Sequence, residues 1–312
     1  MKPFIKACEI WAPSHQGLEL EFVSGHYGEL NNFRSVSEGK TFGYDHGLPG
    51  KAWAQRHPIV LNDLKSSYFE RGDAAEKAGI TTAIAMPVFA GQCLQAVMVM
   101  LCGDDEEVSG AIELWHCDER ESHDLAFVDG YFGKLERFEF VSRHTSFRRG
   151  TGLPGIVWET GMPKLFPKLG RSHKFIRSES AVESGITTGL GVPFHSLPHQ
   201  IYVMTFLSAL GTPIARQIEL WAPSYDNSLL LFSEGYTVDQ FDLNEQYAET
   251  KLTLGQGVIG RTFLTGMPQI CIDMDEILCS ETFPERGLDV SSLVTFPIFE
   301  DGYCRCVIAL YT

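Results

Sequence analysis

The sequence predicts an α+β protein made of three copies of one domain, each with a central antiparallel sheet flanked by helices. Two observations carry this prediction. Short motifs recur in the same order at nearly constant spacing, and within each repeat the strand-like runs outnumber the helical ones and form local hairpins. The 312 residues are 44% hydrophobic, which is enough apolar material for two or three ordinary domains. We expect domains over residues 1–104, 108–210 and 213–312.

Three motifs mark the repeat. Each copy begins with a strand-like Glu-[Ile/Leu]-Trp segment, continues with a glycine motif of G-L-P-G type, and closes with an apolar strand that contains a proline. Neighbouring versions of each motif lie 104 to 106 residues apart, which is the size of an ordinary domain. The first residues of these motifs are Glu9, Glu113 and Glu219; Gly47, Gly152 and Gly257; and Pro87, Pro193 and Pro297.

The elements of a copy follow one order. The Glu-x-Trp strand and a second apolar run, such as 229–232, are separated by a polar turn and predict a hairpin. A variable stretch leads to the glycine motif, which begins a short helix that a proline stops. A short strand and a polar variable segment follow. Two apolar strands, such as 81–89 and 94–101, end the copy. The helix-stopping prolines are Pro58, Pro163 and Pro268.

The glycine motifs of the second and third copies also match a dinucleotide-binding fingerprint, as in Gly255-x-Gly257-x-x-Gly260. A parallel crossover after such a motif needs about ten to twelve residues, whereas the proline stops this helix sooner. We therefore expect a tight turn before a short helix, with the last glycine of the motif at the helix start. A bulky aromatic residue recurs on that helix and is expected to be buried against the sheet: Trp53, Trp158 and Phe263.

This order of motifs resembles the GAF domain, three times over and across essentially the whole chain. The most similar variant is the GAF-like region of plant NIN-like regulators, in which a strand of I-W-A-P type precedes G-L-P-G-R-V-[FW] and an A-L-P-V-F strand. We find no counterpart of the RWP-RK DNA-binding segment of those regulators. The resemblance implies three tandem GAF-like (profilin-like) domains. GAF domains as a family bind cyclic nucleotides, tetrapyrroles, other small molecules or metals, or only one another, so the ligand stays open.

Composition and charge exclude several classes of function. Lys and Arg number 25 against 40 Asp and Glu, which gives a formal net charge of -15. We predict no nucleic-acid partner, because a phosphate-backbone binder needs a basic face. No segment approaches the roughly 18 apolar residues of a membrane span, and Met1-Lys2-Pro3 opens no signal peptide. The eight cysteines are scattered without a C-x-x-C pair, which favours a reducing, cytoplasmic setting.

The sequence predicts a non-enzymatic protein without a metal site. Serine-nucleophile, Walker and H-E-x-x-H patterns are absent. The resemblance offers one enzymatic alternative, since some GAF-like proteins are free methionine sulfoxide reductases. That chemistry needs a thiolate of low pKa and a resolving thiol. Cys271 and Cys279 are the candidates, but their acidic neighbours would raise the pKa of a thiol.

The polar variable segment forms the lid of the pocket in GAF-like domains, and its charge differs among the copies. It is mixed in the first copy, acidic in the third and basic in the second. If one copy binds a small anionic ligand, we expect the second to do so, because Arg and Lys bind carboxylates and phosphates. The candidate residues are Lys164, Arg171, His173 and Arg177. The alternative interpretation of these cations is a solvated helix or an interface with an acidic neighbour.

The leading functional hypothesis is a small-molecule sensing or regulatory binding module. In this hypothesis the variable segment closes over a ligand and shifts the orientation of neighbouring copies. The alternative is a ligand-free interaction scaffold, which would associate with itself or dock a signalling protein.

Overall fold

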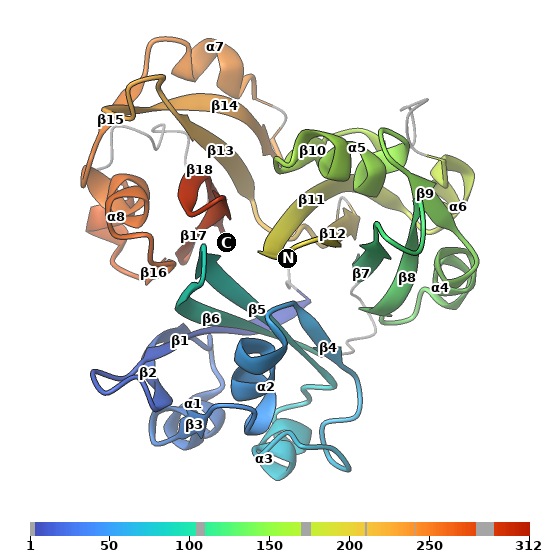
Figure 1. The fold of residues 1–312 in the computed structure, drawn as a ribbon, viewed down its shortest axis with the longest axis vertical. Coiled ribbons are helices and arrows are strands. Elements are labelled where there is room, and N and C mark those ends of the chain that lie inside the picture. The colour runs from blue at the N-terminus through green and yellow to red at the C-terminus, as the bar shows by residue number, and fades with distance from the viewer. Residues whose placement is uncertain (1–3, 104–109, 170–175, 210, 240, 279–289) are drawn as a thin grey trace.

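The computed structural model describes the whole chain except residues 1–3, 104–109, 170–175, 210, 240 and 279–289. It contains three six-stranded sheets in which all the pairs of neighbouring strands are antiparallel (Figure 1). The strand order is the same in every sheet. Counted within a copy, it runs 3-2-1-6-5-4, so the first and last strands are neighbours at the centre. The predicted fold class, α+β with flanking helices, is confirmed.

The described elements of the three copies correspond one to one. The first copy has β1 (Ile5–Pro13), β2 (Glu19–His26), α1 (Asn31–Glu38), β3 (Thr41–Gly43), α2 (Gly47–Gln55), β4 (Ile59–Leu61), α3 (Gly72–Lys77), β5 (Thr82–Ala90) and β6 (Cys93–Cys102). The second has β7 (Gly110–Asp118), β8 (Asp124–Tyr131), α4 (Glu136–Arg143), β9 (Ser146–Arg148), α5 (Gly152–Thr160), β10 (Lys164–Phe166), α6 (Ser178–Glu183), β11 (Ile186–Leu197) and β12 (Gln200–Ala209). The third has β13 (Gln217–Pro223), β14 (Leu229–Thr237), α7 (Leu243–Tyr247), β15 (Lys251–Thr253), α8 (Gly257–Thr265), β16 (Gln269–Cys271), α9 (Met274–Leu278), β17 (Leu293–Glu300) and β18 (Tyr303–Tyr311).

The glycine motif fixes how the helix of each copy lies on the sheet. The helices α2, α5 and α8 begin at the first glycine of the motif, whose φ angle is positive. The last glycine lies in the first turn, against the backbone of the preceding short strand. A Cβ atom on Gly50 would come within 2.0 Å of the carbonyl oxygen of Gly43, and one on Gly155 within 2.1 Å of that of Arg148. The prediction of a tight turn and a short helix is therefore confirmed.

The recurring aromatic residue on that helix is not equally buried in the three copies. Trp158 is buried, as predicted, and its Nε1 donates a hydrogen bond to Glu119 Oε1 at 3.3 Å. The prediction of a buried ring was wrong for Trp53 and Phe263, which are half-buried. Each packs on the edge of its core, and the Trp53 ring meets Tyr44 edge to face, with 5.2 Å between centroids.

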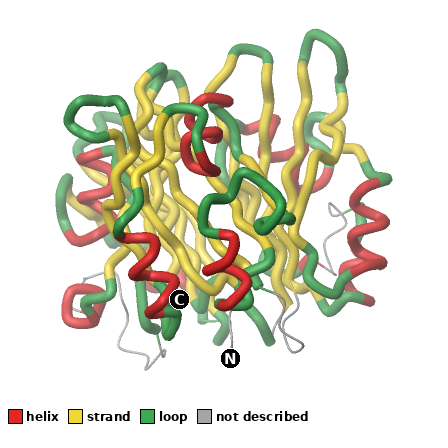
Figure 2. Tube along the Cα trace, turned by 90° about the horizontal axis from the view of Figure 1, so that it is seen from below, coloured by secondary structure: helices red, strands yellow, loops and turns green. Residues whose placement is uncertain are grey.

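Each sheet has one apolar face against its own helices and another in the middle of the molecule. The helix-side cores contain the fully buried indoles of the Glu-x-Trp motifs: Trp11, Trp115 and Trp221. The opposite faces of the three sheets meet and form one shared core, to which each copy contributes equivalent residues such as Met86, Val192 and Phe296. In Figures 1 and 2 the strands surround the centre and most helices lie outside.

The three copies form a closed ring. The fourth strand of each copy contacts the second strand of the next: β4 contacts β8, β10 contacts β14, and β16 contacts β2. Polar side chains join two of these interfaces. Asn62 Nδ2 donates a hydrogen bond to Asp129 Oδ1 at 3.1 Å, and Lys164 Nζ lies 3.0 Å from both carboxylate oxygens of Glu234. Three equivalent head-to-tail contacts that close on themselves amount to a pseudo-threefold arrangement.

The described part of the chain contains no helix of the length and hydrophobicity that a membrane crossing requires.

Candidate functional site

A carboxylate is buried at the same place in every copy. The glutamate of the Glu-x-Trp motif lies in the middle of the first strand and is fully inaccessible to solvent in all three copies. In the first copy, Glu9 accepts hydrogen bonds from Trp11 Nε1 at 3.0 Å and from the hydroxyl of Tyr27 at 3.1 Å. A buried charge is costly unless it is paired, so each copy must supply partners for this group.

In the first copy the main partner is Arg71, the residue that precedes α3. Its guanidinium donates to both carboxylate oxygens of Glu9, with 2.9 Å between Nη2 and Oε2, and also to the hydroxyl of Ser37 on α1. Such a bidentate pair is the strongest geometry for a buried ion pair. Four aromatic rings surround the guanidinium, with centroids 5.0–5.8 Å from its central carbon: those of Trp11, Phe33, Phe42 and Phe69.

The second copy repeats this arrangement. Arg177 precedes α6 and donates to both oxygens of Glu113, with an Nη2–Oε2 distance of 2.8 Å. Ser142 and Thr205 each add a hydroxyl donor at 2.7 Å. Burial by itself would raise the pKa of Glu113, but the charge of Arg177 and these hydrogen bonds hold the pKa below its ordinary value.

In the third copy, no arginine among the described residues pairs with the buried glutamate, and neutral groups donate the hydrogen bonds instead. Glu219 accepts hydrogen bonds from Trp221 Nε1 at 2.8 Å, from the side-chain amide of Gln217, and from the hydroxyl of Tyr311 at 3.4 Å. The hydroxyl of Tyr247 on α7 is a further donor. Burial raises the pKa of Glu219 to about 7, and these neutral donors counter the rise only in part.

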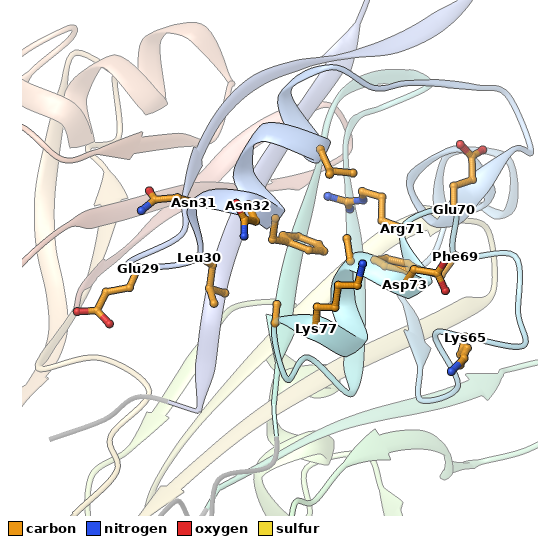
Figure 3. A pocket seen from close by; sticks show the side chains of 15 residues that line it. Glu29, Leu30, Asn31, Asn32, Lys65, Phe69, Glu70, Arg71, Asp73 and Lys77 are labelled. Carbon is orange, nitrogen blue, oxygen red and sulfur yellow. The ribbon is translucent and has the colours of Figure 1, made fainter.

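A cleft of about 940 Å³ lies beside the buried pair of the first copy, between α1 and α3. Figure 3 shows its walls: Asn31 and Asn32 come from α1, while Asp73 and Lys77 come from α3. Arg71 also lines this cleft, and its Nε has no hydrogen-bond partner among the described residues. The variable segment of the sequence, from Lys65 to Ala78, thus supplies one whole wall.

Several charges at the mouth of this cleft are already compensated. Lys65 Nζ lies 2.8 Å from Glu76 Oε1, and Lys40 Nζ lies 3.3 Å from Glu70 Oε2. For Asp73 and Lys77 we find no ion pair within the part of the chain that the structure describes. The cleft therefore offers a ligand the carboxylates of Asp73 and Glu29, the ammonium group of Lys77 and two amides above a buried guanidinium.

The cations predicted from the sequence to bind an anion in the second copy lie in different places. Lys164 is in β10 and pairs with Glu234 of the third copy, while Arg177 is buried against Glu113. Arg171 and His173 lie outside the described residues. The anion site in the second copy stays a prediction. For Lys164, the contact matches the alternative interpretation of an interface with an acidic neighbour.

The Glu-x-Trp motif predicts a strand, but the sequence analysis does not identify the buried ion pair that its glutamate forms. A signal was available, because an acidic residue stood inside an apolar strand at the same repeat position three times. A second signal was the arginine that follows it by 62 residues in the first copy and by 64 in the second. A charge in a buried strand requires a partner, and these arginines are the equivalent cations.

Five of the described cysteines have a thiol pKa that is raised by burial, which is the opposite of what a catalytic thiol requires. Burial and a hydrogen bond to Glu276 raise the pKa of Cys271 to about 11, although a backbone hydrogen bond at Asp273 acts in the opposite direction. Cys279, the other candidate, lies outside the described residues. Burial also raises the pKa of Cys8 and of Cys304 to about 12. No cluster of three or more metal-ligating side chains occurs in the described ranges.

No family model and no curated protein matches the sequence. Solved structures match parts of it. The A. aeolicus nlh2 GAF domain in an inactive state is 19% identical, with 33% of this chain and 60% of that chain covered and a TM-score of 0.26. The free methionine-R-sulfoxide reductase from Neisseria meningitidis is 14% identical over 31% of this chain and 52% of its own, with a TM-score of 0.25. The GAF domain of a two-component sensor histidine kinase from Bacillus halodurans is 11% identical over 45% and 78%, with a TM-score of 0.28.

The first two matches each span less than two thirds of the solved chain. The resemblance to NIN-like regulators in particular stays a prediction from the sequence. The three six-stranded antiparallel sheets with flanking helices are the tandem α+β architecture that the sequence predicts.

Proposed function

We propose that the chain is a non-enzymatic regulatory module that binds a small polar molecule in the cleft of the first copy. The observation that carries the proposal is the position of this cleft, directly beside the buried pair of Arg71 and Glu9. Its volume of about 940 Å³ is that of a small-molecule site. The ligand class follows from the walls: a molecule with an anionic group for Lys77 and a donor for Asp73.

The same position suggests how binding would be transmitted. Arg71 immediately precedes α3, and its guanidinium is fixed to the strand β1 through Glu9 and to the helix α1 through Ser37. A ligand that draws α1 and α3 together would change the geometry of this pair. Because β1 also lies at the centre of the sheet, the change would reach the surfaces on which the other copies pack.

The test is a thermal-shift screen with nucleotides, amino acids, carboxylates and oxyanions. A ligand at a hundred times its dissociation constant should stabilise the protein by about 2.7 kcal/mol. Lys77→Met should abolish the shift, whereas Lys251→Met, at an exposed lysine on β15 of the third copy, should leave it intact. The proposal fails if no compound shifts the melting temperature, or if Lys77→Met and Lys251→Met respond alike.

A protein-interaction scaffold is the second candidate function, and one observation favours it. The outer face of the second copy exposes Phe140 on α4 and Val182 on α6, by 64% and 59%. The first copy carries Ser35 and Glu76 at the equivalent repeat positions. Exposed apolar side chains on adjacent helices are typical of docking surfaces. Phe140→Ser would weaken self-association or partner binding under this alternative, and would leave ligand binding in the first copy unchanged.

A further inference from the structure

A second cleft lies where the first and third copies meet, and the proposed function does not use it. Its volume is about 580 Å³. The first copy contributes the start of β1, the end of β2 and part of β6. The third copy contributes residues 213–216, which lead into β13, together with Ser291, Ser292 and parts of β17 and β18. The lining includes apolar members of the shared core and its edge: Ile5, Met100, Ile214, Val294 and Leu310.

The titratable Lys, Arg, His, Asp and Glu side chains of this inter-copy cleft are mainly basic. Lys6, His26 and Arg216 line it, and Glu29 is the acidic residue of the lining. The Nζ of Lys6 donates a hydrogen bond to the carbonyl oxygen of Gly79 at 3.0 Å, which holds the ammonium group in place. Burial lowers the pKa of His26, so its ring is neutral at pH 7 and can donate a hydrogen bond. The ammonium group of Lys6 thus faces a cleft with a single acidic side chain in its lining, although the net charge of the chain is -15.

We propose that this inter-copy cleft binds a small molecule with an apolar body and a single anionic head, such as a hydrophobic carboxylate or sulfonate. The apolar floor cannot satisfy a polar ligand, because buried polar groups without partners are costly. An anionic head placed beside Lys6 finds a charge-assisted donor, while the body lies against the apolar side chains that line the cleft.

The inter-copy cleft is distinct from the cleft of the first copy, although the two clefts have three lining residues in common. Both clefts contact Glu29, Leu30 and Ala78, but the other residues that line them differ: the first cleft lies between α1 and α3, whereas the inter-copy cleft is lined by β1, β6 and the third copy. An occupant of the inter-copy cleft would touch the first and third copies at once. It would therefore stabilise the ring at the contact that joins its two ends.

The probe for this proposal is 1-anilinonaphthalene-8-sulfonate, an apolar aromatic molecule with one anionic group. We expect its fluorescence to titrate with one saturable site per chain in the folded protein. Lys6→Met removes the charge and keeps the apolar stem, and should weaken binding at least tenfold. Ser291→Trp fills the cleft from an exposed position and should abolish binding. Melting curves of each variant establish that it is folded.

Matched controls separate this site from other surfaces. Lys251→Met and Ser291→Thr should bind the probe as the unmodified chain does. Lys77→Met should also leave it unchanged, so failure of the proposed function and failure of this proposal give different results. Unsaturable binding, or equal affinity in Lys6→Met, Ser291→Trp and the controls, would overturn the proposal.

Discussion

The first and third copies place a glutamate at the same point of the same strand and stabilise it by different means. In the first copy a guanidinium pairs with Glu9, and the positions around it hold small or apolar residues, Ala7, Ser37 and Leu101. In the third copy the equivalent positions hold Gln217, Tyr247 and Tyr311, which are larger and bring neutral donors. All three copies therefore bury a hydrogen-bonded carboxyl group at this position, and the neighbouring residues determine whether it is charged.

The largest effect is expected in a copy that uses an ion pair. Arg177→Met leaves the carboxylate of Glu113 buried without a cation, which should cost about 3–5 kcal/mol in the free energy of unfolding. Urea unfolding monitored by tryptophan fluorescence measures this loss. The double variant Arg177→Met/Glu113→Gln should recover much of it, because no charge is then buried. A loss below about 1 kcal/mol in the single variant would contradict this account of the pair.

A second comparison concerns the aromatic residue on the helix of each glycine motif. Trp158→Ala should cost about 3 kcal/mol, at the lower end for a buried tryptophan, because the residue keeps 9% of its surface exposed. Trp53→Ala should cost clearly less, since that ring is half-buried. Chemical denaturation of both variants side by side checks the order. Equal losses would mean that exposure in the native fold does not govern the contribution of this position.

The pH dependence of stability should have opposite signs in the second and third copies. The pKa of Glu219 is raised, so the folded protein binds its proton more tightly than the unfolded chain. The resulting stabilisation is complete below pH about 4.5 and is lost as the pH rises towards 7. The pKa of Glu113 is lowered, so its contribution is lost as the pH falls. Glu219→Gln should reduce the loss of unfolding free energy that occurs between pH 5 and pH 8. The expected reduction is roughly 1–3 kcal/mol at pH 8.

The matched variant Glu113→Gln should destabilise the protein at neutral pH, because it leaves Arg177 without its counter-charge. Denaturation midpoints measured between pH 5 and pH 8 test both variants. If Glu219→Gln and Glu113→Gln change stability in the same direction at pH 8, the proposed difference between the copies is wrong.

The smallest effect is expected at the contact between the second and third copies. Lys164→Ala removes the ion pair with Glu234, but the lysine side chain is 40% exposed. Such pairs contribute below about 1 kcal/mol, and salt weakens them. In thermal melts at low salt, Lys164→Ala should therefore unfold at a slightly lower temperature than the unmodified chain. At high salt this difference should disappear. A salt-independent loss of several degrees would show that Lys164 acts through packing.

The sequence was sufficient to predict the fold, because glycines recur at positions such as Gly50 and Gly155. At these positions the helix packs so closely on the backbone that no side chain would fit. The sequence was not sufficient for the site. Glu9 and Arg71 are 62 residues apart and meet only when α3 folds over β1, so no local pattern joins them. The difference in burial between Trp53 and Trp158 could not be predicted either, because these equivalent positions have different neighbours in the folded structure. The partner of Lys164 comes from another copy, and only the closed ring brings the two together.

The shared core has a consequence for how the chain responds to stress. In a chain of independent domains each domain has its own hydrophobic core, so one domain can unfold while the others stay intact. Here the inner face of every sheet is covered by the other two copies. Opening one copy would bring the apolar surfaces of both neighbours into contact with water. The three repeats are thus bound to lose their structure together, and the protein behaves as one cooperative unit with a threefold internal plan.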